Sequence, residues 1–101
     1  MAGEVVRKQE ALTLLANHQS TLKDFGVNSL MLFGSVARDE AQTDSDVDLL
    51  VEFDRPIGLF TFVRLKRYLE EILECSVDLG TPDSLKPYLQ ESVFREAVRA
   101  F

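Results

Sequence analysis

Two aspartates, Asp46 and Asp48, lie at the start of a predicted strand over residues 47–53. Apolar residues alternate along this segment, as expected of a strand with one buried face. Because side chains alternate between the two faces of a strand, both carboxylates share one face. Two acids that close repel each other unless a cation lies between them, and carboxylate oxygens are ligands that Mg²⁺ prefers. A lone Asp-x-Asp pair is weak evidence, since exposed strands often carry alternating acids.

A Gly-Ser pair, Gly34 and Ser35, follows the short apolar run 30–33, which is predicted to be a buried strand. Gly34 allows a sharp turn and a close approach of the backbone to a ligand. Ser35 lies where a helical turn would begin, so free backbone N–H groups and a hydroxyl could receive an anion. Ten residues separate Ser35 from Asp46. A phosphate-binding turn opposite a carboxylate pair suits Mg²⁺ bound to nucleotide phosphates, and the combination is far more specific than either part.

The pattern G-S-x10-D-x-D resembles the signature of the polymerase-β-like nucleotidyltransferases. In a chain of 101 residues, the phrases LFGSVARDEA and SDVDLLVEF look like the minimal nucleotidyltransferases, the MntA-like antitoxins of HEPN toxins. The resemblance implies an α/β nucleotidyltransferase-like sandwich with a small mixed sheet flanked by helices, forming a single minimal domain over residues 1–101. It also implies Mg²⁺ as cofactor and ATP as the substrate that donates AMP. One departure is Asp39, where relatives often have Gly.

The same resemblance assigns the metal ligands. Asp46 and Asp48 would hold the metals that carry the triphosphate. Asp78, in a predicted strand over residues 76–79, matches a third carboxylate that would complete the metal nearest the acceptor hydroxyl and help remove its proton. For Asp78 the alternative is an ordinary acid on an exposed strand face.

Phosphate binding is assigned to Gly34 and Ser35, which would hold the β- and γ-phosphates. Arg38, one turn past Ser35, could neutralise charge on the leaving pyrophosphate. The alternative for Ser35 is a plain helix cap. The alternative for Arg38 is a surface ion pair, with candidate partners Asp39, Glu40 and Asp44.

The resemblance implies transfer of AMP to a hydroxyl, with tyrosine favoured, of a cognate HEPN ribonuclease toxin, which is thereby neutralised through a two-metal mechanism. The alternative is a binding module that masks the toxin stoichiometrically, with transfer secondary or absent. Transfer to an aminoglycoside or other small molecule is disfavoured, because such enzymes usually carry a second domain for the acceptor.

The composition of the chain limits the classes of partner and the cellular location that are expected. The net charge of −6 and the pI of about 4.7 argue against direct nucleic-acid binding, which needs a basic surface. Cys75 is the only cysteine, which excludes an internal disulfide and favours a cytoplasmic protein. It is predicted to be a small core residue, and His18 a surface residue. No apolar run approaches the ~18 residues of a membrane span, so no membrane association is expected.

The remaining elements follow from periodicity and turn residues. An amphipathic helix is predicted over residues 4–24, with Gly26 as its C-terminal cap. A second helix is predicted over 59–74, after a loop that contains Pro56 and Gly58. A short C-terminal helix is predicted over 91–101. The order helix, strand, strand, helix, strand, helix is typical of an α/β sandwich.

Overall fold

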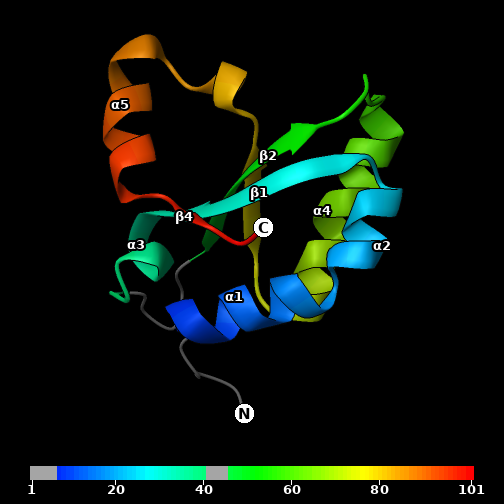
Figure 1. The fold of residues 1–101 in the computed structure, drawn as a ribbon, viewed down its shortest axis with the longest axis horizontal. Coiled ribbons are helices and arrows are strands. Elements are labelled where there is room, and N and C mark those ends of the chain that lie inside the picture. The colour runs from blue at the N-terminus through cyan, green and yellow to red at the C-terminus, as the bar shows by residue number, and fades with distance from the viewer. Residues whose placement is uncertain (1–6, 41–45) are drawn as a thin grey trace.

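A mixed four-stranded sheet forms the centre of the computed structural model, which describes residues 7–40 and 46–101 (Figure 1). The strand order is β3-β2-β1-β4. The central pair β1–β2 and the edge pair β1–β4 are antiparallel, whereas β2 and β3 run parallel. The predicted α/β architecture with a small mixed sheet is therefore confirmed. The strands are β1 (Val27–Phe33), β2 (Val47–Phe53), β3 (Val77–Gly80) and β4 (Val98–Arg99).

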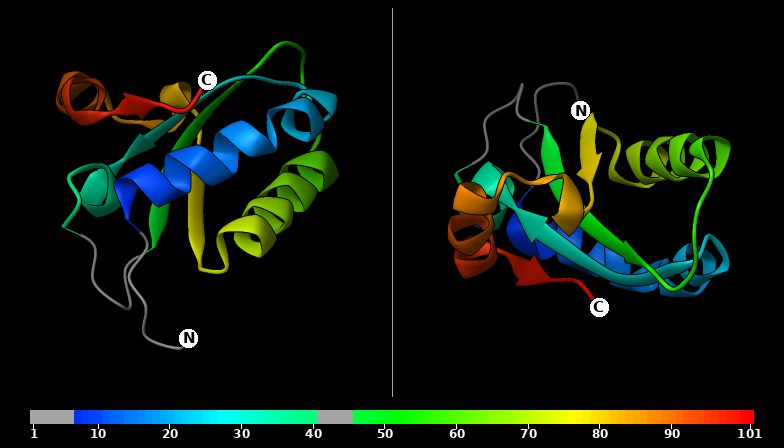
Figure 2. Two further views of the ribbon diagram at one scale, coloured as in Figure 1. Left: turned by 60° about the horizontal axis from the view of Figure 1, so that its bottom comes forward. Right: turned by 90° about the horizontal axis from the view of Figure 1, so that it is seen from above.

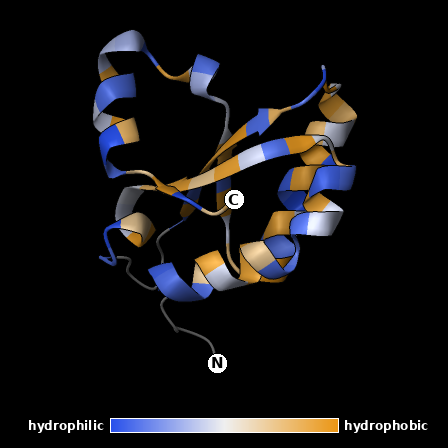
Figure 3. Cartoon of the chain, viewed as in Figure 1, coloured by the Kyte–Doolittle hydropathy of each residue, from blue (hydrophilic) through white to orange (hydrophobic). Residues whose placement is uncertain are grey.

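Three helices cover one face of the sheet: α1 (Lys8–Asn17), α2 (Gln19–Asp24) and α4 (Leu59–Leu73). In the left view of Figure 2, α1 crosses in front of the strands and α4 runs beside it. Their apolar side chains meet those of the strands in one cluster, which includes Leu15, Leu65, Leu69, Leu32, Leu49 and Val51. In Figure 3 the hydrophobic colour runs along the strands and alternates with polar colour along the helices. Burial of this single apolar layer supplies the main driving force for folding.

The opposite face of the sheet is only partly covered. After β3 the chain forms a 3-10 turn, η1 (Pro82–Ser84), and then helix α5 (Pro87–Glu96), which lies on the side of the molecule away from α4 (Figures 1 and 2). Pro87 occupies the first turn of α5, as its fixed φ angle and missing N–H predict. No residue of α5 is buried, unlike the residues of α1, α2 and α4 that face the core.

The predicted C-terminal helix over 91–101 is confirmed up to Glu96 and is wrong for residues 97–101. The helix ends at Glu96, and the chain continues as β4, which pairs with β1. Leu30 accepts a hydrogen bond from the Ala100 N–H at 2.8 Å and donates one to the Phe101 carbonyl at 3.2 Å. The spacing of the apolar residues fits a helix, but it carries no information about the free edge of β1. Pairing with that edge satisfies backbone groups that would otherwise need water.

The predicted first helix breaks in two at His18, whose backbone (φ −105°, ψ 14°) is not helical. The His18 ring donates from Nδ1 to the Leu14 carbonyl at 2.8 Å and packs edge-on against Tyr68 with ring centres 5.9 Å apart. His18 is therefore half-buried rather than a surface residue. Residues 4–6 of the predicted helix lie outside the described residues. Gly26, at φ +95°, donates to the Lys23 carbonyl at 2.9 Å, which confirms it as the helix end.

The segments with the clearest periodicity form as predicted. Strand β2 and helix α4 match their predicted ranges within one residue, and β1 begins three residues before the predicted strand. Cys75 packs against the core next to β3, as predicted. Within the described ranges, no helix combines the length and the apolar character that crossing a membrane requires.

Candidate functional site

Sheet register brings Asp48 and Asp78 next to each other. In the parallel pair β2–β3, the Cα of Asp48 is the direct partner of the Cα of Asp78. Neighbouring strands lie ~4.8 Å apart, and paired residues point to the same face. That face is opposite the helical layer, because Val47, Leu49, Val77 and Leu79 on the other face are buried. Asp48 is half-buried and Asp78 is exposed. Two carboxylates from adjacent strands therefore share the open face of the sheet.

Gly34 places the predicted phosphate turn directly against Asp48. On the other side of β2, Asp48 is paired with Phe33, the residue before Gly34. Gly34 has φ +75°, which L-residues with side chains rarely adopt. A Cβ atom at Gly34 would overlap the Asp48 Oδ2 atom and lie 3.0 Å from its Cγ. Only glycine therefore allows the turn and the carboxylate to approach this closely.

The turn after Gly34 is a single helical turn, α3 (Gly34–Ala37). Phe33 is its N-cap residue and makes no side-chain capping bond, so the alternative of Ser35 as a plain helix cap is wrong. Ser35 is the second residue of the turn. The first intrahelical bond is donated by the Arg38 N–H to the Gly34 carbonyl at 3.2 Å, which leaves the earlier N–H groups without helical acceptors. Buried Val36 and Ala37 anchor the turn to the core.

Arg38 forms ion pairs beside this turn. Its Nη1 donates to Glu96 Oε2 at 3.0 Å, and its Nε lies 3.4 Å from Glu40 Oε2. The Glu40 pair confirms one predicted alternative, whereas Glu96 on α5 was missed because it lies 58 residues further along the chain. The hydrogen bond with Glu96 is the main reason why the pKa of Arg38 is raised. Asp44, another predicted partner, lies outside the described residues.

The pKa of the Asp48 carboxyl depends on burial and on the charges of other predicted site residues. Burial raises the pKa of the Asp48 carboxyl, and the charges of Asp78 and Asp46 raise it further, whereas Arg38 lowers it. The charges of Asp78, Asp46 and Arg38 therefore lie close enough to Asp48 to influence its ionisation. Asp46 is exposed and directly precedes β2. In the part of the chain that the structure describes, no three acidic, histidine or cysteine side chains already converge on one metal position.

The chemistry of the donors nevertheless fits a hard cation. The three predicted ligands, Asp46, Asp48 and Asp78, offer only carboxylate oxygens, which favour Mg²⁺ over softer metals. The missing Cβ at position 34 lets the Asp48 carboxylate lie directly against the turn, because Asp48 Oδ2 occupies the place that such a Cβ would take. All three carboxylates belong to exposed or half-buried side chains.

Asp39 and Cys75 were also singled out in the sequence, and the structure accounts for both. Asp39 adopts φ +59°, a left-handed conformation that favours glycine, which explains the glycine expected there from the family pattern.

Burial, followed by the charges of Asp46 and Glu70, raises the pKa of the Cys75 thiol. A raised pKa disfavours the reactive thiolate, in agreement with a packing role for Cys75.

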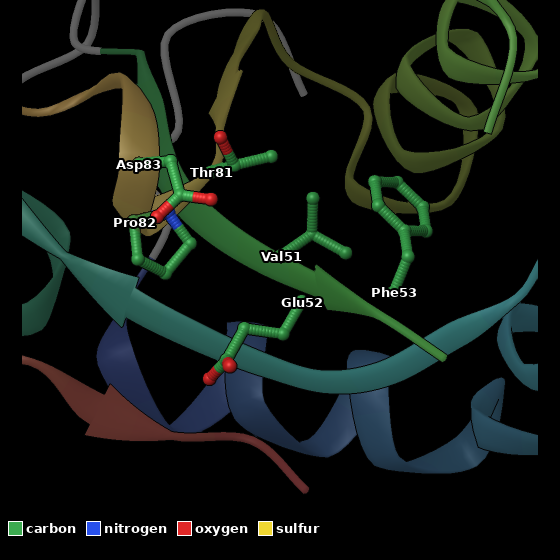
Figure 4. Close-up of a pocket in the computed structure, with 6 residues that line it drawn as sticks. All are labelled: Val51, Glu52, Phe53, Thr81, Pro82 and Asp83. Carbon is green, nitrogen blue, oxygen red and sulfur yellow. The ribbon is translucent and has the colours of Figure 1, made fainter. Parts of the chain in front are cut away.

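A separate hollow of about 290 Å³ lies beyond the end of β3 (Figure 4). Figure 4 shows Glu52 on one side of β2 and Val51 and Phe53 on the other, with the turn after β3 opposite them. The hollow contains none of the predicted site residues, and its lining is Val51, Glu52, Phe53, Thr81, Pro82 and Asp83.

Comparison with known proteins identifies the family and the fold. The nucleotidyltransferase domain family matches residues 15–100. The protein adenylyltransferase MntA of Thermococcus cleftensis is 42% identical over 91 residues, which cover 89% of this chain and 92% of that protein. A solved structure named as that of a minimal nucleotidyltransferase superposes with a TM-score of 0.72 at 42% identity, over 87% of this chain and 93% of its own.

A more distant structure shares the fold. It is a complex of a tri-AMPylated HEPN toxin with an MNT antitoxin from Shewanella oneidensis. It superposes with a TM-score of 0.63 at 22% identity, covering 89% of this chain and 71% of that one. Together with the family match over most of the chain, these similarities confirm the resemblance inferred from the motif. The chain belongs to the nucleotidyltransferase family, among relatives that include MntA-like minimal nucleotidyltransferases.

Proposed function

We propose that this protein is an antitoxin nucleotidyltransferase that transfers AMP from ATP to a hydroxyl, with tyrosine favoured, of a partner HEPN toxin and so neutralises it. The observation that carries the proposal is the contact of the Gly34 turn with Asp48, which is paired in turn with Asp78. A phosphate-binding turn and a carboxylate pair thus meet on one open face. The names of the relatives support the transferred group and the class of partner.

In this proposal Asp46, Asp48 and Asp78 hold Mg²⁺. The bound metal would neutralise phosphate charge and lower the pKa of the acceptor hydroxyl. Asp78, exposed at the edge strand of the sheet, is placed to accept a hydrogen bond from a hydroxyl that arrives from outside. Asp48 lies between Gly34 and Asp78, and it would therefore contact both the metal-bound phosphates and the acceptor side of the site.

The first turn of α3 binds the triphosphate through its free N–H groups and the Ser35 hydroxyl. Arg38 supplies positive charge at the same turn, and its effect on Asp48 supports its closeness to the reacting phosphates. Backbone donors held by a buried turn are oriented before the substrate arrives, which is an efficient way to stabilise developing charge.

The acceptor belongs to another protein in this proposal. A net charge of −6 suits a less acidic protein partner better than a nucleic-acid backbone. The chain is proposed to act as one minimal domain in the cytoplasm. The second candidate, a module that masks the toxin without transfer, shares the same fold and requires an experiment.

Intact-mass spectrometry of the partner separates the two candidates. With purified protein, ATP and Mg²⁺, we expect the toxin to gain mass in steps of one adenylate and to lose ribonuclease activity. The control omits ATP. If the toxin is inhibited in both reactions and its mass stays unchanged, the masking module is correct and the transferase proposal is wrong.

Ser35→Ala is expected to weaken transfer only moderately. One hydroxyl contact is lost while the backbone N–H groups of α3 remain, so the cost should be about 1–2 kcal/mol, or roughly five- to thirtyfold in kcat/KM. Steady-state kinetics with varied ATP measures this. A loss as large as that of Asp48→Asn would contradict the assignment of Ser35 to phosphate binding alone.

A further inference from the structure

Among the described residues, the shortest ion pair at the candidate site joins Arg38 to a helix that carries none of the predicted site residues. Arg38 Nη1 lies 3.0 Å from Glu96 Oε2, whereas the contact with Glu40 is 3.4 Å. Glu40 is also the more exposed acid, with 67% of its side chain accessible against 47% for Glu96. Since exposed side chains hold one geometry poorly, Glu96 is the stronger anchor of the guanidinium.

The backbones of both partners are fixed by the same strand. Arg38 ends the turn that begins where β1 stops, at Phe33. Glu96 ends α5, and two residues later Val98 pairs with Leu32 of β1. The ion pair therefore links two segments that β1 already holds at a set spacing. Without this link, Arg38 would keep the longer contact with the more exposed Glu40, and its side chain, already 42% exposed, would have more accessible rotamers.

We propose that Glu96 is a positioning residue that holds the Arg38 guanidinium beside the Gly34–Ser35 turn, ready to contact the triphosphate of ATP. The inference rests on the proposed function, in which Arg38 binds phosphate. Arginine presents five donors in a planar fork, so Glu96 can hold one nitrogen while other donors remain for an anion. Fixing the rotamer in advance lowers the entropy lost when ATP binds.

The test is Glu96→Gln in the full chain, with isothermal calorimetry of Mg²⁺-ATP binding in the absence of acceptor. We expect the dissociation constant and the KM for ATP to rise about two- to fivefold, the range of an exposed ion pair, with kcat nearly unchanged. In an Arg38→Gln background, Glu96→Gln should have no further effect. Glu96→Asp, which keeps the charge, should recover part of the affinity.

Glu91→Gln is the matched control. Glu91 lies on the same helix and pairs with Arg95 at 2.9 Å, so the substitution makes the same charge change away from the site. It should leave ATP binding unaltered, and both variants should melt close to wild type. Unchanged or tighter ATP binding by Glu96→Gln would overturn the inference, as would an equal effect with and without Arg38.

The outcomes also separate this inference from the proposed function. If Arg38→Gln weakens ATP binding and Glu96→Gln does not, the positioning role is wrong while transfer to the partner still stands. If wild type binds no Mg²⁺-ATP and leaves the mass of the partner unchanged, the proposed function and the inference are both wrong.

Discussion

Asp48→Asn is expected to abolish AMP transfer while leaving the free protein as stable as wild type or slightly more stable. A metal-bridging carboxylate supplies several kcal/mol to the transition state, so the loss in kcat/KM should be roughly thousandfold or more. Asp48 is half-buried beside Asp78 and near Asp46, and burial and these charges raise its pKa. Such a carboxylate favours the unfolded state at neutral pH, so removing its charge relieves repulsion.

The pH dependence of this effect has a definite sign. Because the pKa of Asp48 is higher in the folded protein than the ordinary value of 3.8, the folded state holds the proton more tightly. Its ionisation therefore destabilises the fold fully above the folded pKa, and the penalty disappears as the pH falls towards the ordinary value. We expect any advantage of Asp48→Asn in melting temperature at pH 7 to shrink on acidification to about pH 4.

Thermal melting with and without Mg²⁺-ATP measures both parts of the prediction. A ligand that binds only the folded state stabilises it, by about 2.7 kcal/mol at a hundredfold excess over its dissociation constant. The melting temperature of wild type should rise when Mg²⁺-ATP is added, and Asp48→Asn should lose most of that rise. Glu71→Gln, an exposed acid on α4, is the control and should keep the full rise. If free Asp48→Asn melts well below wild type, Asp48 is a structural group and the metal assignment loses its physical support.

The parts of the site that the sequence predicts are those determined by local chemistry. Gly34 interrupts an apolar run and has the positive φ that its position suggested. Strand β2 has the predicted bounds, which places Asp48 at its second residue. The assignment of Asp78 came from family resemblance, and the structure shows that Asp78 lies beside Asp48. The chain between β2 and β3 contains α4, and such a crossover allows the parallel pairing that sets Asp78 beside Asp48.

The parts that the sequence does not predict depend on contacts between distant segments. Whether residues 98–101 form a helix or a strand depends on the free edge of β1, which no local pattern describes. Glu96 was missed for the same reason, since an acid in a helix acquires a role only when the fold brings Arg38 to it. The break at His18 likewise reflects packing against Tyr68 of α4. Tertiary contacts override helix propensity most easily at positions where the local preference for a helix is weak.

Gly34→Ala should damage both stability and ATP binding. An alanine at φ +75° costs about 1–2 kcal/mol, and the overlap of its Cβ with the Asp48 carboxylate adds a packing penalty, for a total of about 2–4 kcal/mol. Moving Asp48 or the turn to relieve the overlap also separates the carboxylate from the phosphate-binding N–H groups. Urea unfolding measures the first loss, and calorimetry of Mg²⁺-ATP binding measures the second.

Gly26→Ala is the control for the stability cost of placing a side chain at a positive φ, because Gly26 also has a positive φ, +95°. Its added Cβ would meet Ile57 Cδ1 at 3.0 Å and Arg55 Nε at 3.1 Å. Both atoms lie near the ends of flexible side chains that do not belong to the candidate site. We expect this control to lose stability but to bind ATP normally. In an Asp48→Ala background the overlaps with Oδ2 and Cγ are removed and only the residue-48 Cβ remains, at 3.3 Å, so the cost of Gly34→Ala should fall towards the backbone share of about 1–2 kcal/mol. An equal cost in both backgrounds would show that Gly34 serves only the turn, and that its closeness to Asp48 does not shape the site.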